Sequence, residues 1–146
     1  IADDALAALR ASMSQPQPSY DGPHFSYSGL VIDPHAVQQQ VPFWIGGFTP
    51  RSLRRARELG TGWVPFGLPH DKLREMLDAA PLPDDFEVIL GAGRPVDPIG
   101  EPDRTRRAVQ RTRAAGATIV NVQVTATSAD HYIEQLEALA GLEEGQ

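Results

Sequence analysis

The segment VPFWIGGFTPRSLRRARELGTGWVP, at residues 41–65, decides the fold. It opens with an apolar run that ends in two glycines. Thr49-Pro50 then predicts the start of a helix, because threonine is a good N-cap and proline is favoured at the first helical position. Gly60 is predicted to follow the end of this helix as a C′ residue. A second apolar run begins at Trp63, so the segment predicts a strand, a helix and a second strand.

The same alternation continues toward the C-terminus. Further strands are predicted at 63–66, 86–90 and 117–125. Helices are predicted at 71–80 and 102–115, with Gly116 closing the second of these. A last helix is predicted to begin after its cap, Ser128. The second helix is expected to turn Leu73, Met76, Leu77 and Ala80 inward, and the last one carries Tyr132, Ile133, Leu136, Leu139 and Ala140. Strands that alternate with helices indicate parallel strands joined by right-handed crossovers. Residues 41–146 are therefore predicted to form four consecutive β-α units.

Upstream of these units, residues 1–13 predict a helix with an apolar stripe and with acidic residues in its first turn. Residues 14–40 are rich in proline and predict a long, packed surface loop. Within this loop, Asp21-Gly22 favours a short hairpin, whereas Pro23 directly after it argues against one.

Four β-α units fit either a small open sheet or half of an eight-fold barrel. In the predicted strand at 117–125, three valines share one face, and Asn121 and Gln123 lie on the other. A doubly wound sheet usually has two apolar faces. Polar groups on one face fit the lumen of a barrel near its active-site mouth. We therefore expect an α/β fold that forms half of a TIM (β/α)8 barrel, with residues 1–146 as a single domain.

The composition excludes several kinds of function. A net charge of −6 argues against general affinity for nucleic acid or an anionic membrane. The absence of cysteine excludes disulfides and thiolate metal sites, and the four histidines show no metal-ligand spacing. The absence of cysteine also fits a cytoplasmic protein, which we expect. No apolar run approaches about 18 residues, so we expect no segment to span a membrane. Because the chain begins with Ile1, we expect its N-terminus to be processed, trimmed or cut from a longer chain.

Residues 41–65 resemble the luciferase-like monooxygenase family, in particular its F-420-dependent (deazaflavin) branch, with the pattern P-hydrophobic-W-hydrophobic-G-G-x-[ST]-P, then L-R-R-A and G-D-G-W. Residues 20–25 look like the family's f-D-G-x-x-f loop. Residues 34–38 are similar to its P-x-P-x-Q segment, with Ala36 in place of the second proline. The family usually has Asp where this chain has Thr61, and we interpret that Asp as tying the loop before the strand.

The resemblance covers the family's C-terminal half, and it implies a half barrel with a cofactor at the C-terminal ends of the strands. It implies a bacterial flavin or deazaflavin oxidoreductase, which transfers hydride to, or monooxygenates, a small organic substrate. The expected cofactor is F-420, with FMN as the alternative. The catalytic residues are unknown, because the other half supplies most of the cofactor floor. The chain would then be part of an enzyme, closing a barrel as a homodimer or with a complementary half barrel. Alternatively it is a non-catalytic cofactor-binding or assembly module.

The cofactor-binding residues we predict are Gly46, Gly47, Phe48 and Thr49. Glycines let the backbone approach a ligand closely, and the free amides at the start of a helix form an anion site. We expect this turn to contact the cofactor's phosphate or its ribityl chain. The competing interpretation is that the glycines only permit a tight turn.

The substrate-binding residues we predict are Trp63, Arg94 and Asn121. Each has a structural alternative. Trp63, like Trp44, could be a core aromatic. Arg94 could be a solvated loop side chain, and Asn121 could form an interior hydrogen-bonded pair with Gln123.

Overall fold

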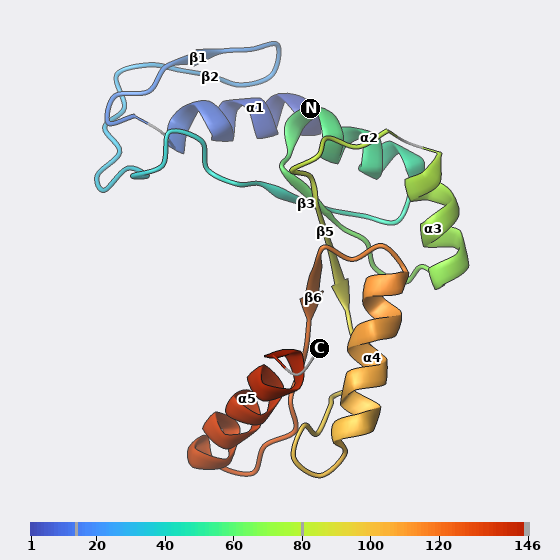
Figure 1. The fold of residues 1–146 in the computed structure, drawn as a ribbon. Coiled ribbons are helices and arrows are strands. Elements are labelled where there is room, and N and C mark those ends of the chain that lie inside the picture. The colour runs from blue at the N-terminus through green and yellow to red at the C-terminus, as the bar shows by residue number, and fades with distance from the viewer. Residues whose placement is uncertain (14, 80, 145–146) are drawn as a thin grey trace. The chain divides into compact units, whose positions relative to one another are not determined.

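The computed structural model describes residues 1–13, 15–79 and 81–144 (Figure 1). Its contacts divide the chain into two compact units, Ile1–Trp63 and Val64–Gln146. Ser14, predicted to begin the long loop, and Ala80, predicted to face inward on its helix, lie outside the described residues. Within the described part of the chain, none of the helices has the length and apolar content that crossing a bilayer requires.

The first unit contains α1, a two-stranded hairpin, β3, α2 and the start of β4. Their bounds are α1 Ala2–Met13, β1 Tyr20–Asp21, β2 Ser26–Tyr27, β3 Trp44–Gly46, α2 Pro50–Leu59 and β4 Gly62–Val64. The helix predicted at residues 1–13 is confirmed, and so is the helix that begins at Thr49-Pro50.

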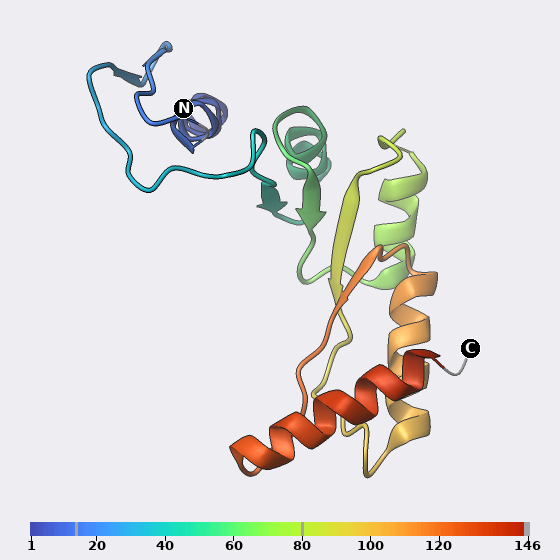
Figure 2. The ribbon, with the colours of Figure 1, turned by 60° about the vertical axis from the view of Figure 1, so that its left-hand side comes forward.

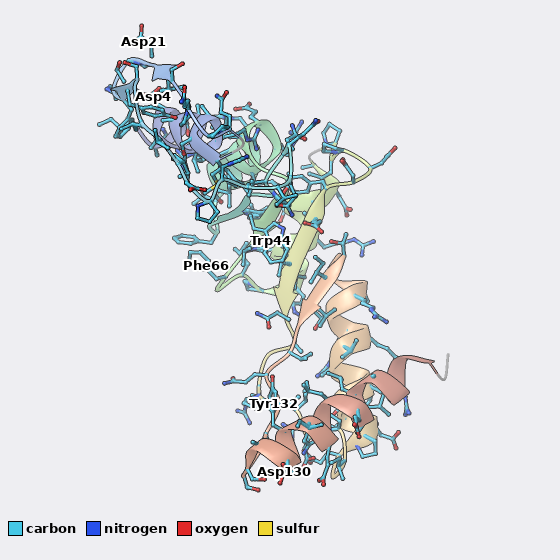
Figure 3. All side chains as sticks on the ribbon, turned by 90° about the vertical axis from the view of Figure 1, so that its left-hand side faces the viewer. Asp4, Asp21, Trp44, Phe66, Asp130 and Tyr132 are labelled. Atoms are coloured by element: carbon cyan, nitrogen blue, oxygen red, sulfur yellow. The ribbon has the colours of Figure 1, made fainter. Side chains whose placement is uncertain are left out.

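The hairpin favoured by Asp21-Gly22 is present, and β1 pairs antiparallel with β2. Asp4 on α1 holds it (Figure 3). The Asp4 carboxylate accepts hydrogen bonds from the Tyr20 hydroxyl at 2.5 Å and from the amides of His24 and Phe25 at 2.8 and 3.0 Å. Pro23 lies in the turn and not in a strand, so its missing N–H removes no hydrogen bond between the two strands. This part of the long loop is therefore packed against α1.

Gly60 follows α2 as predicted, but its backbone is extended, with φ −120° and ψ −177°. Gly60 is the C-cap of α2 and not its C′ residue, so the predicted position is off by one. Glycine is required here by close approach. A Cβ at this position would lie 2.8 Å from the carbonyl oxygens of both Ala56 and Phe43.

The second unit contains α3, β5, α4, β6 and α5 (Figure 2). Their bounds are α3 His70–Asp78, β5 Glu87–Gly91, α4 Pro102–Ala114, β6 Ile119–Asn121 and α5 Ala129–Glu144. β5 and β6 are parallel, with Ile89 opposite Ile119 and Gly91 opposite Asn121. β3 lies beside β4, and within the second unit β5 lies beside β6, so neighbours in the sheet follow one another along the chain.

The strand predicted over 117–125 is shorter than expected. Regular pairing ends at Asn121, and only an isolated bridge between Val124 and Val96 follows. The reason lies in the partner, because the chain leaves β5 after Gly91 and rejoins the ladder only at Val96. The predicted alternation of faces is confirmed: Val120, Val122 and Val124 are half-buried, and Asn121 and Gln123 are exposed.

The burial of the helices only partly follows their apolar patterns. On α3, Leu73 and Met76 are buried as predicted, and Leu77 is half-buried. On α5 the apolar residues Tyr132, Ile133 and Leu136 are exposed, whereas Gln135 is fully buried. Tyr132 is labelled on this helix in Figure 3. Gln135 can be buried because its side-chain amide is hydrogen-bonded to polar groups. Its Nε2 donates to the Asp97 carboxylate at 2.7 Å, and its Oε1 accepts from the Ile99 amide at 3.2 Å.

Candidate functional site

The turn Gly46–Thr49 joins β3 to α2, and a reciprocal set of hydrogen bonds fixes it. The Thr49 hydroxyl oxygen accepts from the Ser52 amide at 3.2 Å. The Ser52 Oγ accepts from the Thr49 amide at 3.1 Å and donates to the Thr49 carbonyl at 2.7 Å. This is a capping box, in which two backbone donors near the helix start are satisfied by two side chains. The first turn of α2 is therefore rigidly held.

The two glycines of the turn have different surroundings. Gly47 has φ +149°, and a Cβ there would lie 2.4 Å from the Ser52 Cβ. Any other residue would be strained and would collide with Ser52. Gly46 and Thr49 are exposed, and 56% of Phe48 is exposed. The requirement for glycine at position 47 is thus structural, and the turn around it is open to solvent.

Ser52 is a site residue that the sequence analysis missed. Besides its bonds to Thr49, its Oγ accepts a hydrogen bond from the indole Nε1 of Trp63 at 3.3 Å. Trp63 is fully buried, so the structure places it behind the turn and not on a ligand-facing surface. Its spacing could have identified Ser52 in the sequence, because it stands three residues after an N-cap threonine, where capping-box partners occur.

The charge around the start of α2 suits an anion. The first turn of this helix has no acidic residue, and Arg51, in the same turn, is exposed. A helix N-terminus carries a partial positive charge, which favours negatively charged groups. The electrostatics of the turn therefore favour a phosphate or carboxylate ligand.

Thr61 stands where the family pattern has Asp, and the structure gives it the tying role that we inferred for that Asp. Its amide donates to the Phe43 carbonyl at 2.9 Å, and its hydroxyl lies 3.4 Å from the same oxygen. The residue before β4 is thus attached to the residue before β3. The backbone amide makes the shorter of these bonds, and an ionised Asp could not replace the hydroxyl as a donor to this carbonyl.

The second unit places Arg94 and Asn121 near the carboxyl ends of β5 and β6. The Ala92 amide donates to the Asn121 carbonyl at 2.9 Å, which holds the start of the loop that carries Arg94 against the end of β6. Both Arg94 and Asn121 are exposed. Trp63 belongs to the other unit, so only two of the three predicted substrate residues share a unit.

A cavity of about 290 Å³ lies beside Arg94's loop, and the sequence analysis did not predict it. Its lining includes Phe66, Leu68 and His70, which follow β4, Leu90 near the end of β5, and Gly93 after that strand. The walls are mostly apolar, and His70, the first residue of α3, contributes an imidazole. The sequence signal was the run Pro-Phe-Gly-Leu-Pro-His at 65–70.

A parallel β5–β6 pair flanked by helices, and a glycine turn that joins β3 to the capped helix α2, define a parallel α/β protein. A family model described as luciferase-like monooxygenase matches residues 1–81, which is more than half of the chain. The chain belongs to the luciferase-like monooxygenase family. This family generally uses flavin-type cofactors, FMN or F-420. No curated protein matches the chain.

Proposed function

We propose that this chain forms the C-terminal half of a TIM barrel in an oxidoreductase that uses a flavin-type cofactor. The reaction is hydride transfer to, or monooxygenation of, a small organic substrate. Membership of the family supports the class of reaction. The observation that carries the proposal is the turn Gly46–Thr49, which is exposed, rigidly capped and followed by a helix start without acidic residues.

The cofactor residues of this proposal are Gly46, Gly47, Phe48 and Thr49. A phosphate fits this turn because Gly46, Phe48 and Thr49 are exposed and the side chain of Arg51 is positive. The amides of Thr49 and Ser52 already bond within the capping box, so the ligand would bind the remaining donors. We favour F-420, with FMN as the alternative, because the turn sequence resembles the deazaflavin branch. The cofactor, once bound, supplies the redox chemistry, and the chain's residues bind and orient it.

The substrate residues of this proposal are Arg94 and Asn121, with Trp63 in a supporting role. Arg94 is exposed and follows Gly93, which lines the cavity, and a guanidinium suits a substrate with an anionic or hydrogen-bond-accepting group. Trp63 acts by holding Ser52, and through it the turn. Trp63 is therefore a positioning residue.

A non-catalytic half-barrel module is the second candidate. The exposed apolar side chains of Tyr132, Ile133 and Leu136 on α5 favour it, because such a surface suits assembly with another chain. The partner would be a second copy or a complementary half barrel. In that case the chain binds a cofactor only weakly and shows no turnover.

Titration of the chain with FMN and with F-420 tests the proposal. Binding is followed by quenching of the cofactor's fluorescence. Arg51→Glu should weaken the binding about tenfold, because it places a negative charge in the first turn of α2. Arg54→Glu, on the same helix but beyond the first turn, is the matched control and should change affinity less than about twofold.

Three outcomes would count against the proposal. If neither cofactor binds, the chain has no cofactor site of its own. If the two charge reversals have equal effects, the ligand does not sit at the start of α2. If sedimentation of dilute chain shows a stable, cooperatively folding monomer, closure of a barrel by two halves is wrong.

A further inference from the structure

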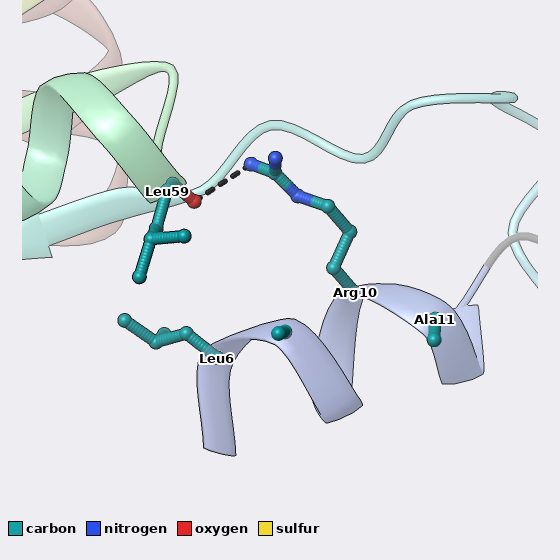
Figure 4. A pocket seen from close by; sticks show the side chains of 5 residues that line it. Leu6, Arg10, Ala11 and Leu59 are labelled. Carbon is teal, nitrogen blue, oxygen red and sulfur yellow. Dashed lines mark hydrogen bonds between the residues drawn. The ribbon is translucent and has the colours of Figure 1, made fainter. Parts of the chain in front are cut away.

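A second cavity, of about 320 Å³, lies between α1 and α2 in the first unit (Figure 4). Leu6, Ala7, Arg10, Ala11 and Leu59 line it. Four of these side chains are apolar, and Arg10 is the only charged one. Its volume is at the lower end of the range of about 300–1,000 Å³ that small-molecule sites occupy. It shares no lining residue with the turn Gly46–Thr49 or with the cavity beside Arg94.

The Arg10 guanidinium is held in one orientation. Its Nη2 donates to the Leu59 carbonyl at 2.7 Å, at the end of α2 (Figure 4). Its central carbon lies 5.4 Å from the centroid of the Phe43 ring, within the range of a cation–π contact. A cation fixed in this way is organised for a ligand before the ligand arrives.

The charge of Arg10 lacks a carboxylate partner. Among residues 1–13, 15–79 and 81–142, no acidic side chain forms an ion pair with it. Its Nε is buried and has no hydrogen-bond acceptor in the described part of the chain. A buried donor without an acceptor is costly, and an arginine offers five donors of which the Leu59 carbonyl uses one. The remaining Nη donors of Arg10 are therefore left for an acceptor in the cavity, whereas the buried Nε is out of reach of a ligand.

We propose that this cavity is a binding site for a small aliphatic monocarboxylate, separate from the cofactor and substrate sites of the proposed function. Its carboxylate would bind Arg10, since planar carboxylates match the guanidinium fork. Its alkyl chain would pack against Leu6 and Leu59. One cation neutralises one charge, and the apolar walls offer nothing to a second, so a monocarboxylate fits better than a phosphate dianion.

The test compares hexanoate with 1-hexanol, which has the same alkyl chain without the charge. Calorimetric titration of the full chain should show hexanoate binding at least about tenfold more tightly than 1-hexanol. Arg10→Met keeps the bulk of the side chain and should abolish this preference. Ala11→Phe fills the cavity while leaving Arg10 in place, and should abolish binding of both ligands.

Equal affinity for hexanoate and 1-hexanol, or no binding of hexanoate, would overturn the proposal, and Arg10 would then act only as a cap on α2. Circular dichroism checks the fold of each variant. If Arg10→Met does not fold, Ala11→Phe decides, since retained hexanoate binding in that variant places the site elsewhere. Hexanoate binding should be the same with and without FMN, so failure of the cofactor proposal leaves this one testable.

Discussion

The indole nitrogen of Trp63 and the hydroxyl of Ser52 form a hydrogen bond of 3.3 Å that joins the start of β4 to the first turn of α2. Trp63 is fully buried and Ser52 is buried, so this bond lies inside the unit. Ser52 also closes the capping box with Thr49 and contacts Gly47. One hydroxyl thus connects the core of the first unit to the turn that we propose binds the cofactor.

Ser52→Ala should lower the free energy of unfolding by about 1–3 kcal/mol, because it leaves the buried Trp63 donor without an acceptor. Urea unfolding followed by tryptophan fluorescence measures this, since both tryptophans of the chain lie in the first unit. Ser12→Ala is the matched control. It removes a hydroxyl whose bond to the Leu9 carbonyl is solvent-exposed, so its effect should stay below about 0.5 kcal/mol. Similar losses of unfolding free energy in both variants would show that the hydrogen bond between Ser52 and Trp63 contributes no more than a solvent-exposed one.

Two glycine-to-alanine substitutions should change the stability of the chain in opposite directions. Gly60→Ala should destabilise the chain by about 1–3 kcal/mol, because the new Cβ meets two backbone oxygens that cannot move away cheaply. Gly141→Ala should stabilise it by roughly 0.5–1 kcal/mol, because Gly141 lies within α5 and its Cβ would meet open space. Thermal unfolding by circular dichroism gives both values. A stabilising Gly60→Ala would mean that the close approach to Ala56 and Phe43 is absent.

The Asp97 carboxylate should make stability depend on acid pH. Its hydrogen bond from Gln135, and then that from the Gly100 amide, hold its pKa below the ordinary value of 3.8. Because its pKa is lowered in the folded state, the charged Asp97 contributes to the free energy of unfolding. This contribution is fully present above about pH 3.8 and is lost as the pH falls through the folded-state pKa. Asp97→Asn, which keeps an acceptor but no charge, should therefore be less stable than wild type at about pH 7. The two denaturation midpoints should converge as the pH falls through the lowered pKa of Asp97, as measured by far-ultraviolet circular dichroism. A difference that stays constant with pH would contradict this.

The phenol of Tyr20 should lose its proton at a higher pH than that of an ordinary tyrosine. Its hydrogen bond to the Asp4 carboxylate, followed by desolvation, raises the pKa of its phenol above the ordinary value of 10.0. Stability from this pair is complete below pH 10 and is lost as the pH rises through the raised pKa. Ultraviolet titration of tyrosinate, with Tyr20→Phe subtracted, isolates this group among the three tyrosines. Asp4→Asn should move its step to lower pH, and an unmoved step would show that Asp4 does not control it.

Much of the architecture was predictable because it is encoded locally. Thr49-Pro50 starts α2, and Ser128 caps α5, its Oγ accepting from the His131 amide at 3.1 Å. Gly116 follows α4 with φ +109°, a conformation that suits glycine. These positions depend on residues within one helical turn, so a single sequence carries the information. The same holds for the glycines and threonine of the proposed cofactor turn.

Other features depend on residues far apart in the chain, and only the tertiary structure decided them. Sequence alone determined the order of strands and helices and the caps at Thr49 and Ser128, since neighbours along the chain suffice for these; the hairpin at Asp21-Gly22 was favoured by its turn dipeptide but opposed by Pro23. The end of β6 at Asn121 depends on where β5 departs, and the burial of Gln135 depends on Asp97. Ser52 becomes important only because Trp63 reaches it from the next strand. Pairing, burial and hydrogen-bond satisfaction are set by partners that the fold brings together, and no periodicity along the chain encodes them.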